Sequence, residues 1–304
     1  MATTGSIGPI VNYREHARRH AAILGRFAQR KPVGFASMML IFLIVFAAIF
    51  ANLIAPHDPL RQFGDMAFAS PFSISPEGTP YILGGDTLGR DVFARILYGA
   101  RISLYVGLAS VGLGVAFGSV IGLTSGYLGG WVDNVIQRIM DGTMALPPLI
   151  LALLIAAVLG PSTFNITVAI AIVWVPTVNR VVRGSVLSAK ENTYVTAAHA
   201  MGCSDVRVAV RHILPNILAP LTVLATLMIA QAILLEASLS FLGVGTPPPT
   251  PSWGAMVSGP ARDYIAHEPL LLIFPGAALG LTVLAFSLAG DTLRDMWDPK
   301  LKGI

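Results

Sequence analysis

The residues of this chain that could do chemistry are few, and their spacing does not match a catalytic or metal site. His199 and His212 are single histidines in a polar loop, and His267–Glu268 lacks the second histidine of a zinc-binding helix. Cys203 is the only cysteine, so neither an internal disulfide nor a cysteine metal site can form. The chain contains no G-x-x-x-x-G-K-S/T phosphate loop and no G-x-S-x-G nucleophile elbow. The sequence therefore predicts no catalytic residue, no metal ligand and no cofactor bound by this chain.

Three carboxylates border long apolar stretches and are candidates for a polar role at a membrane. Glu236 follows one apolar run, Asp141 precedes another, and Asp291 follows a third. An unpaired carboxylate in a lipid-like environment is costly, so these side chains should face protein or water. Two interpretations of Glu236 stay open, namely a hydrogen-bonded tie between helices and a contact with a transported solute. Asp141 is likewise a candidate pathway or structural residue.

The composition requires a membrane around these residues. Charged residues make up 12% of the 304 residues, against roughly 25% in ordinary soluble proteins. Apolar residues make up 54%, and the mean hydropathy is +0.71. Such a chain cannot cover itself with polar surface and needs lipid as a partner, which argues against a soluble enzyme, a disordered chain and a coiled coil.

Uncharged stretches of sufficient length predict six transmembrane helices and an all-α, polytopic membrane protein. A bilayer core of about 30 Å needs about 20 apolar residues in a helix. Gly160 and Pro161 divide the longest stretch, which we interpret as a helical hairpin. The first span is an anchor and not a cleaved signal peptide, because a long polar segment precedes it. The expected spans are about 33–55, 102–124, 143–160, 164–182, 216–243 and 270–290.

The distribution of lysine and arginine predicts which helix ends face the cytoplasm. Basic residues gather in segments 1–32, 180–211 and 293–304, which fall on one side of a six-span chain. By the positive-inside rule that side is cytoplasmic, so both termini are predicted to be cytoplasmic. Segments 56–101 and 244–269 are then external. This placement accounts for the formal net charge of +4 without a nucleic-acid partner.

Glycines spaced four residues apart predict close contacts between helices. Four residues turn a helix by about 400°, so such glycines form a slowly drifting strip on one side. A strip without side chains lets another helix approach closely. It could serve static packing or a sliding interface in a protein that changes shape. The glycines concerned are Gly114, Gly118, Gly122, Gly126 and Gly130 in the second span and Gly276 and Gly280 in the sixth.

The polar loop 185–216, between the fourth and fifth spans, is the most informative part of the chain. Small residues precede Gly202, which is a good helix stop. Ser204 is then a good N-cap, with Asp205 at the positive end of a second helix, and Pro215 starts the next span. Two short helices joined at a glycine could dock into a groove on another protein; the alternative is an ordinary surface loop.

This loop resembles the EAA loop of binding-protein-dependent ABC transporter permeases. Thr196, Ala197 and Ala198 match the EAA triplet, Gly202 matches the glycine four residues on, and Leu214–Pro215 match the closing pair. Thr196 stands where the family usually has Glu, so no role can rest on that carboxylate, although the docking shape is kept. Other segments resemble the C-type permeases of the dipeptide, oligopeptide and nickel subfamily; they are 83–104, 236–253 and 290–301.

The resemblance implies the permease fold of type I ABC importers. The implied organisation is a cytoplasmic tail at 1–32, a first transmembrane helix at 33–55, an external segment at 56–101, a permease core at 102–292 with a cytoplasmic coupling loop at 184–215, and a cytoplasmic tail at 293–304. Two different permeases form the pathway, two ATPase subunits dock beneath them, and an extracytoplasmic substrate-binding protein docks outside. ATP and Mg would be bound by the ATPase subunits, so this chain is not expected to be an enzyme.

The resemblance also implies roles for particular residues and a location in a bacterial-type inner membrane. The expected contact with an ATPase is made by Thr196, Ala197, Ala198, Gly202 and Pro215, and the outer segments 83–101 and 246–268 meet the binding protein. The expected cargo is a di- or oligopeptide, although nickel chelates and other small solutes are also carried within this subfamily.

Two other function classes were weighed against a permease. A self-sufficient secondary transporter or channel is expected to place ionisable residues near the membrane middle and often has two halves of matching hydropathy. An intramembrane enzyme needs a nucleophile–base pair or a metal site at mid-span. Neither set of features is evident in the sequence.

Overall fold

Long apolar helices run along the length of the protein in the computed structural model, which describes residues 28–29 and 31–297. The basic residues of 1–27, and Lys300 and Lys302, lie outside the described residues, so the tails expected at 1–32 and 293–304 are seen only in part. The α-helices are α2 (Pro32–Ile49), α3 (Ala51–Ile54), α4 (Val92–Leu128), α5 (Gly130–Met144), α6 (Pro148–Leu159), α7 (Thr163–Lys190), α8 (Thr193–Ala200), α9 (Asp205–Arg207), α10 (Leu214–Phe241), α11 (Trp253–Val257), α12 (Pro260–Asp263) and α13 (Leu270–Trp297).

The number of helices that could span a membrane equals the predicted six when one bent pair of helices is counted as a single span. Within the described residues, five helices are long and apolar enough to cross a bilayer, and α5 with α6 makes a sixth crossing, bent by 92°. The expected all-α fold is confirmed. The strands described are β1 (Ser73–Ile74) and β2 (Pro80–Tyr81), which form a short antiparallel hairpin.

The third predicted span, 143–160, is wrong as a single straight helix. The helix found there, α6, has 12 residues, about 18 Å at 1.5 Å per residue, and cannot cross a core of about 30 Å alone. Pro147 is extended, with φ −55° and ψ 137°, because a following proline disfavours helical geometry. The chain therefore turns sharply between α5 and α6, and the crossing is shared between them. Gly160, with φ +84°, makes the expected turn into α7.

The second span is longer than expected. Helix α4 begins at Val92, ten residues before the predicted start, and has 37 residues, about 55 Å. Its N-terminus is capped by Asp91, whose Oδ1 accepts hydrogen bonds from the backbone N–H of Phe93 and Ala94 at 2.8 and 3.3 Å. Helix α4 therefore extends well beyond the thickness of a bilayer core.

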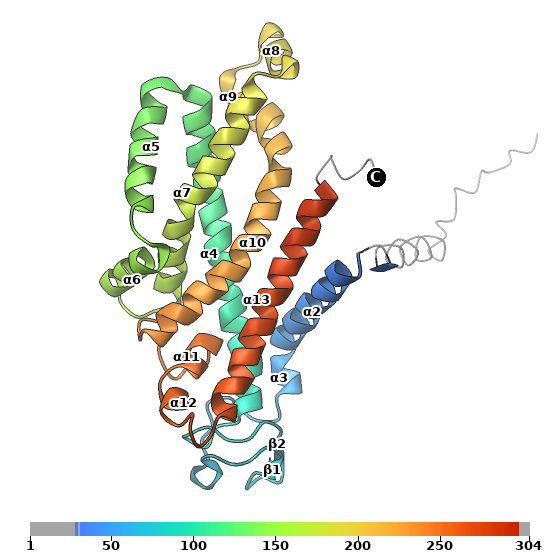
Figure 1. Ribbon diagram of the computed structural model, residues 1–304, viewed down its shortest axis with the longest axis vertical. Coiled ribbons are helices and arrows are strands. Elements are labelled where there is room, and N and C mark those ends of the chain that lie inside the picture. The colour runs from blue at the N-terminus through green and yellow to red at the C-terminus, as the bar shows by residue number, and fades with distance from the viewer. Residues whose placement is uncertain (1–27, 30, 298–304) are drawn as a thin grey trace, which may run out of the picture.

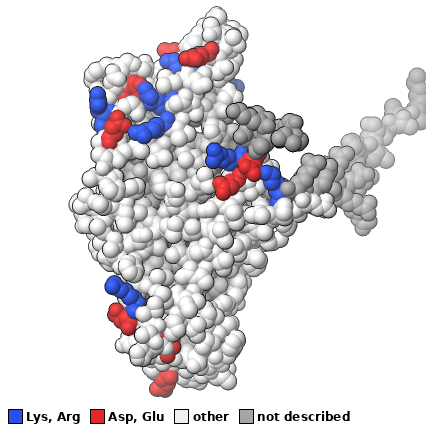
Figure 2. Space-filling view, in the orientation of Figure 1, with Lys and Arg blue, Asp and Glu red and all other residues white. Residues whose placement is uncertain are grey.

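Charge separates the two ends of the bundle. On the face drawn in Figure 2, Lys, Arg, Asp and Glu gather toward both ends, and a broad band between them is free of charge. One end carries α8 and the other end carries β1 and β2, whereas the start of α2 lies at the side of the bundle, about midway between the two ends (Figure 1). Lys31 and Asp295 form an ion pair of 2.7 Å that joins the start of α2 to the end of α13.

The glycine strip of α4 is confirmed as a packing seam, and its partner is α7. A Cβ added to Gly118 would lie 2.6 Å from the Cβ of Val178 and 2.9 Å from the carbonyl oxygen of Val175. At Gly122 it would lie 2.7 Å from the carbonyl oxygen of Asn179. Even a methyl group at these positions would collide with the α7 backbone.

The glycine prediction was wrong at three positions. Gly130 lies beyond the seam, because Gly129 ends α4 and Gly130, with φ +56°, starts α5. A Cβ at Gly130, Gly276 or Gly280 would meet nothing within 4 Å. In α13 it is Gly290 that approaches another helix closely, with an added Cβ 2.7 Å from Cδ2 of Leu227 in α10.

A buried polar cluster fastens the segment between α3 and α4 to the start of α4. His57 Nδ1 lies 2.8 Å from Asp91 Oδ2, and His57 Nε2 lies 3.2 Å from Ser75 Oγ. The Tyr81 hydroxyl donates to the carbonyl oxygen of Gly89 at 2.9 Å. Burial, followed by the nearby Asp91 and other carboxylates, raises the pKa of Tyr81 to about 12. The hydroxyl therefore stays protonated and available as a donor at physiological pH.

We expect the substitution Gly118→Ala to destabilise the protein, because the new methyl group would force α4 and α7 apart. Overpacking of this kind costs about 1–3 kcal/mol and should lower the unfolding temperature in detergent by several degrees. Gly112→Ala is the matched control, since it lies in the same helix with open space around it. Equal unfolding temperatures for the two variants would show that the seam does not depend on the missing side chains.

Candidate functional site

The loop between α7 and α10 projects beyond the rest of the bundle at one end (Figure 1). We call residues 191–205 the knuckle. It consists of the short helix α8, a turn at Gly202 and the first residue of α9. Because both ends of the knuckle continue directly into long helices, a force applied to it acts on α7 and α10.

The turn at Gly202 has the geometry that the sequence predicted. Gly202 has φ +80°, its N–H donates to the carbonyl oxygen of His199 at 2.9 Å, and the N–H of Cys203 donates to that of Ala198 at 3.1 Å. This pair of hydrogen bonds is the Schellman motif, which closes a helix with a left-handed residue. The turn fixes the direction in which the chain leaves α8.

Helix α8 has one face against the protein and one face open. Val195 and Ala198 are 4% and 1% exposed and belong to the main hydrophobic core. Thr196, Ala197 and Gly202 are exposed. Ala198 was expected to make a docking contact. It packs instead against the hydrophobic core, beneath the exposed residues of α8.

The second short helix of the loop was wrongly predicted as a separate element. Helix α9 has three residues and continues through a π-turn, Val208–Ile213, into α10, so that Asp205–Phe241 is one long helix. Ser204 occupies the N-cap position, but its side chain makes no capping hydrogen bond. Pro215 has no N–H and disturbs the preceding helical turn, and the wider π-turn lies where that disturbance falls.

The structure does not bring Pro215 to the exposed face of α8. Pro215 is exposed, but it lies ten residues beyond Asp205 in a continuous helix, about 15 Å along the axis. Of the five residues expected to contact a partner, Thr196, Ala197 and Gly202 share the exposed end of the knuckle.

A tyrosine at the end of α4 braces the knuckle, and sequence reasoning missed it. The Tyr127 hydroxyl donates to Asp205 Oδ1 at 2.9 Å and lies 3.3 Å from His199 Nε2. Lys190 Nζ, at the end of α7, donates to the carbonyl oxygen of Tyr127 at 2.7 Å and lies 5.3 Å from its ring centroid. These residues are 63 to 78 positions apart from Tyr127, so no local pattern could have revealed the brace.

Two ion pairs join α5 to α7 below the knuckle. Arg183 binds Asp133 through two nitrogens at 2.6 Å each, and Asp133 is buried. Arg180 Nη2 donates to Asp141 Oδ1 at 3.0 Å, and both of these side chains are more than half exposed. Asp141 therefore has a cationic partner on α7, and the pair lies on an open face of the bundle.

Glu236 is completely buried near the other end of the bundle and accepts hydrogen bonds from three serine hydroxyls. Ser240 and Ser252 donate to its Oε1 at 2.8 and 3.0 Å, and Ser103 lies 3.4 Å from Oε2. Ser103 is in α4 and Ser252 caps α11, so the carboxylate links α10, α4 and α11. These contacts are those of a tie between helices.

The cluster around His57 has the connectivity of a Ser-His-Asp triad without the access that such chemistry requires. His57, Ser75 and Asp91 are 7%, 4% and 0% exposed, and Asp91 also caps α4. Among the residues that the structure describes, no group of three or more His, Cys, Asp or Glu could hold a metal ion.

Comparison with known proteins identifies two families along the chain. Residues 118–303 match the family described as binding-protein-dependent transport system inner membrane component. Residues 23–71 match the N-terminal TM domain of oligopeptide transport permease C.

Curated relatives match over nearly the whole chain. A di/tripeptide transport system permease protein, DppC of Pseudomonas aeruginosa, is 43% identical over 276 residues, which are 91% of this chain and 90% of that protein. Two glutathione transport system permease proteins named GsiD are also similar. The one from Pectobacterium atrosepticum is 42% identical over 90% of this chain and 89% of its own length, and the one from Escherichia coli is 41% identical over the same shares.

Proposed function

Because the chain belongs to the family of binding-protein-dependent inner membrane transport components and is a multi-pass permease subunit of an ABC importer, we propose that its cargo is a short peptide. The observation that carries this proposal is similarity over about nine-tenths of the chain to permeases named for di/tripeptides and glutathione. The matches to family models cover residues 23–71 and 118–303, and the second includes the knuckle.

Partners follow from membership of the family. An ABC importer of this kind works with a partner permease, ATPase subunits and a substrate-binding protein. We propose that the partner permease is a different chain, that two ATPase subunits dock beneath the pair, and that ATP and Mg are bound there. This chain then supplies half of the pathway and has no cofactor of its own.

The knuckle is our candidate for the contact with an ATPase. Three features support this role: it projects from the bundle (Figure 1), its Gly202 turn is fixed by two backbone hydrogen bonds, and Thr196 and Ala197 are exposed on it. Tyr127 connects it to α4 as well as to α7 and α10. Movement of the ATPases would thus reach three long helices through one rigid element, which is the kind of bistable coupling that a transport cycle needs.

We further propose that the knuckle end faces the cytoplasm and that the segment expected at 56–101 is external, with its last ten residues forming the start of α4. The supporting observation is that α8 lies at one end of the bundle and β1 and β2 at the other, with the end of α13 directed toward the α8 end (Figure 1). Arginines and a lysine gather at the knuckle end, as the positive-inside rule requires; they are Arg180, Arg183, Lys190, Arg207 and Arg211. In this arrangement the core runs from α4 to α13.

The cargo can be tested by reconstituting the chain with its partner permease, its ATPase subunits and its binding protein in proteoliposomes. We expect ATP-dependent uptake of a labelled tripeptide that an excess of unlabelled dipeptide or tripeptide reduces. A nickel chelate in equal excess is the control and should not compete. Uptake of the chelate without uptake of peptides would overturn the proposed cargo.

The coupling role of the knuckle predicts a specific effect of Gly202→Val. A β-branched residue at φ +80° is strained by at least about 1–2 kcal/mol, enough to shift a two-state turn about tenfold. We expect ATP hydrolysis to continue in the assembled complex while uptake per ATP falls several-fold. Gly202→Asn is the matched control, because asparagine adopts the left-handed conformation more easily. Unchanged uptake with Gly202→Val would contradict the coupling role.

The proposed orientation predicts that the two ends of the bundle can be labelled only from opposite sides of the membrane. Met201 and Ile74 are suitable positions, because they are 76% and 69% exposed. In a Cys203→Ser background, Met201→Cys should react with a membrane-impermeant maleimide only in inside-out vesicles, and Ile74→Cys only in right-side-out cells. Reaction of both from one side would show that the arrangement is wrong.

A further inference from the structure

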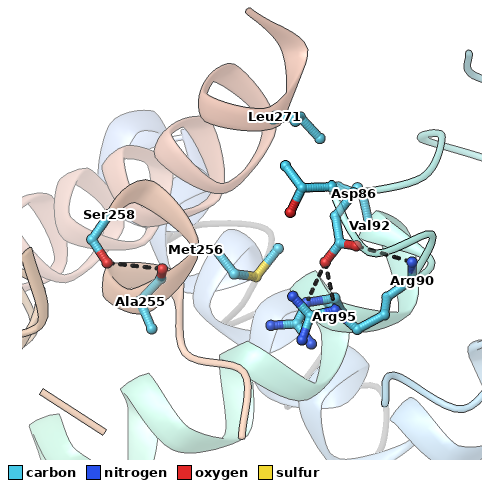
Figure 3. A pocket seen from close by; sticks show the side chains of 9 residues that line it. Asp86, Arg90, Val92, Arg95, Ala255, Met256, Ser258 and Leu271 are labelled. Carbon is cyan, nitrogen blue, oxygen red and sulfur yellow. Dashed lines mark hydrogen bonds and ion pairs between the residues drawn. The ribbon is translucent and has the colours of Figure 1, made fainter. Parts of the chain in front are cut away.

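A small charged pocket lies at the external end of the bundle, where the segment before α4 meets α11 and the start of α13 (Figure 3). Its volume is about 60 Å³. The residues that matter for its chemistry are Asp86, Arg90, Arg95, Met256 and Ser258. The two external segments of the chain, which are far apart in sequence, thus meet at one pocket.

The pocket holds two guanidinium groups and one carboxylate. Arg90 Nε donates to Asp86 Oδ2 at 2.7 Å, and Arg95 Nε lies 3.5 Å from the same oxygen. Asp86 Oδ1 accepts from the backbone N–H groups of Leu88 and Arg90 at 2.9 and 3.0 Å. The oxygens of the Asp86 carboxylate are therefore hydrogen-bonded within their own loop. Two arginines and one aspartate leave the cluster with one positive charge in excess.

Of the two arginines of the pocket, Arg95 has the longer contact with Asp86, at 3.5 Å against 2.7 Å for Arg90. Its side chain is 8% exposed. In the part of the chain that the structure describes, its hydrogen bond is from Nη1 to the carbonyl oxygen of Pro59 at 3.1 Å. A guanidinium has five N–H donors, and a buried charge without a full set of partners is unfavourable. An anion that enters the pocket would meet both Arg95 and Arg90.

The size of the pocket decides which kind of anion can enter. A volume of about 60 Å³ is far below the roughly 300–1,000 Å³ of pockets that enclose small-molecule ligands. It accommodates the carboxylate at the end of a side chain, and it is too small to enclose a peptide. A small inorganic anion would fit as well, whereas a carboxylate that enters the pocket must be carried on a larger body that stays outside it.

We propose that the pocket receives the carboxylate of an aspartate or glutamate side chain presented by the substrate-binding protein as it docks. Arginine pairs bind carboxylates with well-defined, often bidentate, geometry, and complementary charge sets the register of a docking surface. The proposal rests on the proposed function, because it assumes an importer with a binding protein. It adds the place and the chemistry of one docking contact.

Met256 offers a test that keeps both arginines in place. Its side chain in α11 points toward Arg95 (Figure 3), and glutamate has nearly the same length as methionine. The substitution Met256→Glu would supply a carboxylate from within the chain and neutralise the pocket. Met256→Gln has the same shape without the charge and is the matched control.

The measurement is the Kd of the binding protein for the whole transporter in lipid nanodiscs. We expect Met256→Glu to weaken binding about tenfold, because a like charge then faces the incoming carboxylate, and Met256→Gln to bind as the unchanged protein does. Arg90→Gln, at a partly exposed position, should also weaken binding and provides a second variant. ATP hydrolysis without the binding protein reports whether each variant has assembled.

A charge-neutralising scan of the binding protein then identifies the partner residue. One Asp→Asn or Glu→Gln change should weaken binding to the unchanged transporter and have little further effect on Met256→Glu, since coupled residues are non-additive. Equal binding by Met256→Glu and Met256→Gln, whether strong or weak, would overturn the proposal. So would a defect in peptide uptake without a defect in docking, because the carboxylate would then belong to the cargo.

Failure of the proposal and failure of the proposed function give different results. If the unchanged transporter neither binds the binding protein nor hydrolyses ATP faster in its presence, the importer assembly itself is wrong. If it does both and the two Met256 variants do not differ, only the docking contact is wrong.

Discussion

Close contact between α4 and α7 is the constraint on which the rest of the fold depends. Lipid is as apolar as leucine, so no hydrophobic force drives helices together within a bilayer, and packing at short range must hold them. Four glycines of α4, at 114, 118, 122 and 126, let the backbone and β-carbons of α7 approach to distances that any side chain would prevent. The side chains of Val178, Val182 and Val186 lie directly against these glycines, so the seam holds the two helices together by close packing.

The two ends of this seam are secured in different ways. At the end that carries β1 and β2 the ties are buried, since Glu236 and Asp91 are 0% exposed and each links several elements. At the knuckle end the brace from Tyr127 to Asp205 is exposed, with the Asp205 side chain 75% open to solvent. Exposed hydrogen bonds exchange readily with water and contribute little net stability. Below this brace the buried Asp133 binds Arg183 and joins α5 to α7, so the exposed Tyr127–Asp205 contact is the part of this end that can change most easily.

The sequence predicted those features that depend on residues near one another in the chain. Absence of charge located the spans, the four-residue spacing located the α4 seam, and Gly202 marked the end of α8. Predictions failed where a distant or neighbouring element decides the outcome. Gly276 and Gly280 have the spacing of a seam but face no helix of this chain, and Pro147–Pro148 redirects a segment that composition alone makes look like a span.

The candidate site shows the same division. Thr196, Ala197 and Gly202 were found from a local motif, whereas Tyr127, Lys190 and the Asp86–Arg90–Arg95 pocket join residues that only the folded chain brings together. The charged residues of such an apolar chain are informative because each one is costly. With 12% of residues charged and lipid penalising each one that is unpaired, a buried arginine with an incomplete set of partners is a cost that packing does not require. Arg95 holds such a position, where the segment before α4 meets α11, and its partners there are the Pro59 carbonyl oxygen and, at 3.5 Å, Asp86.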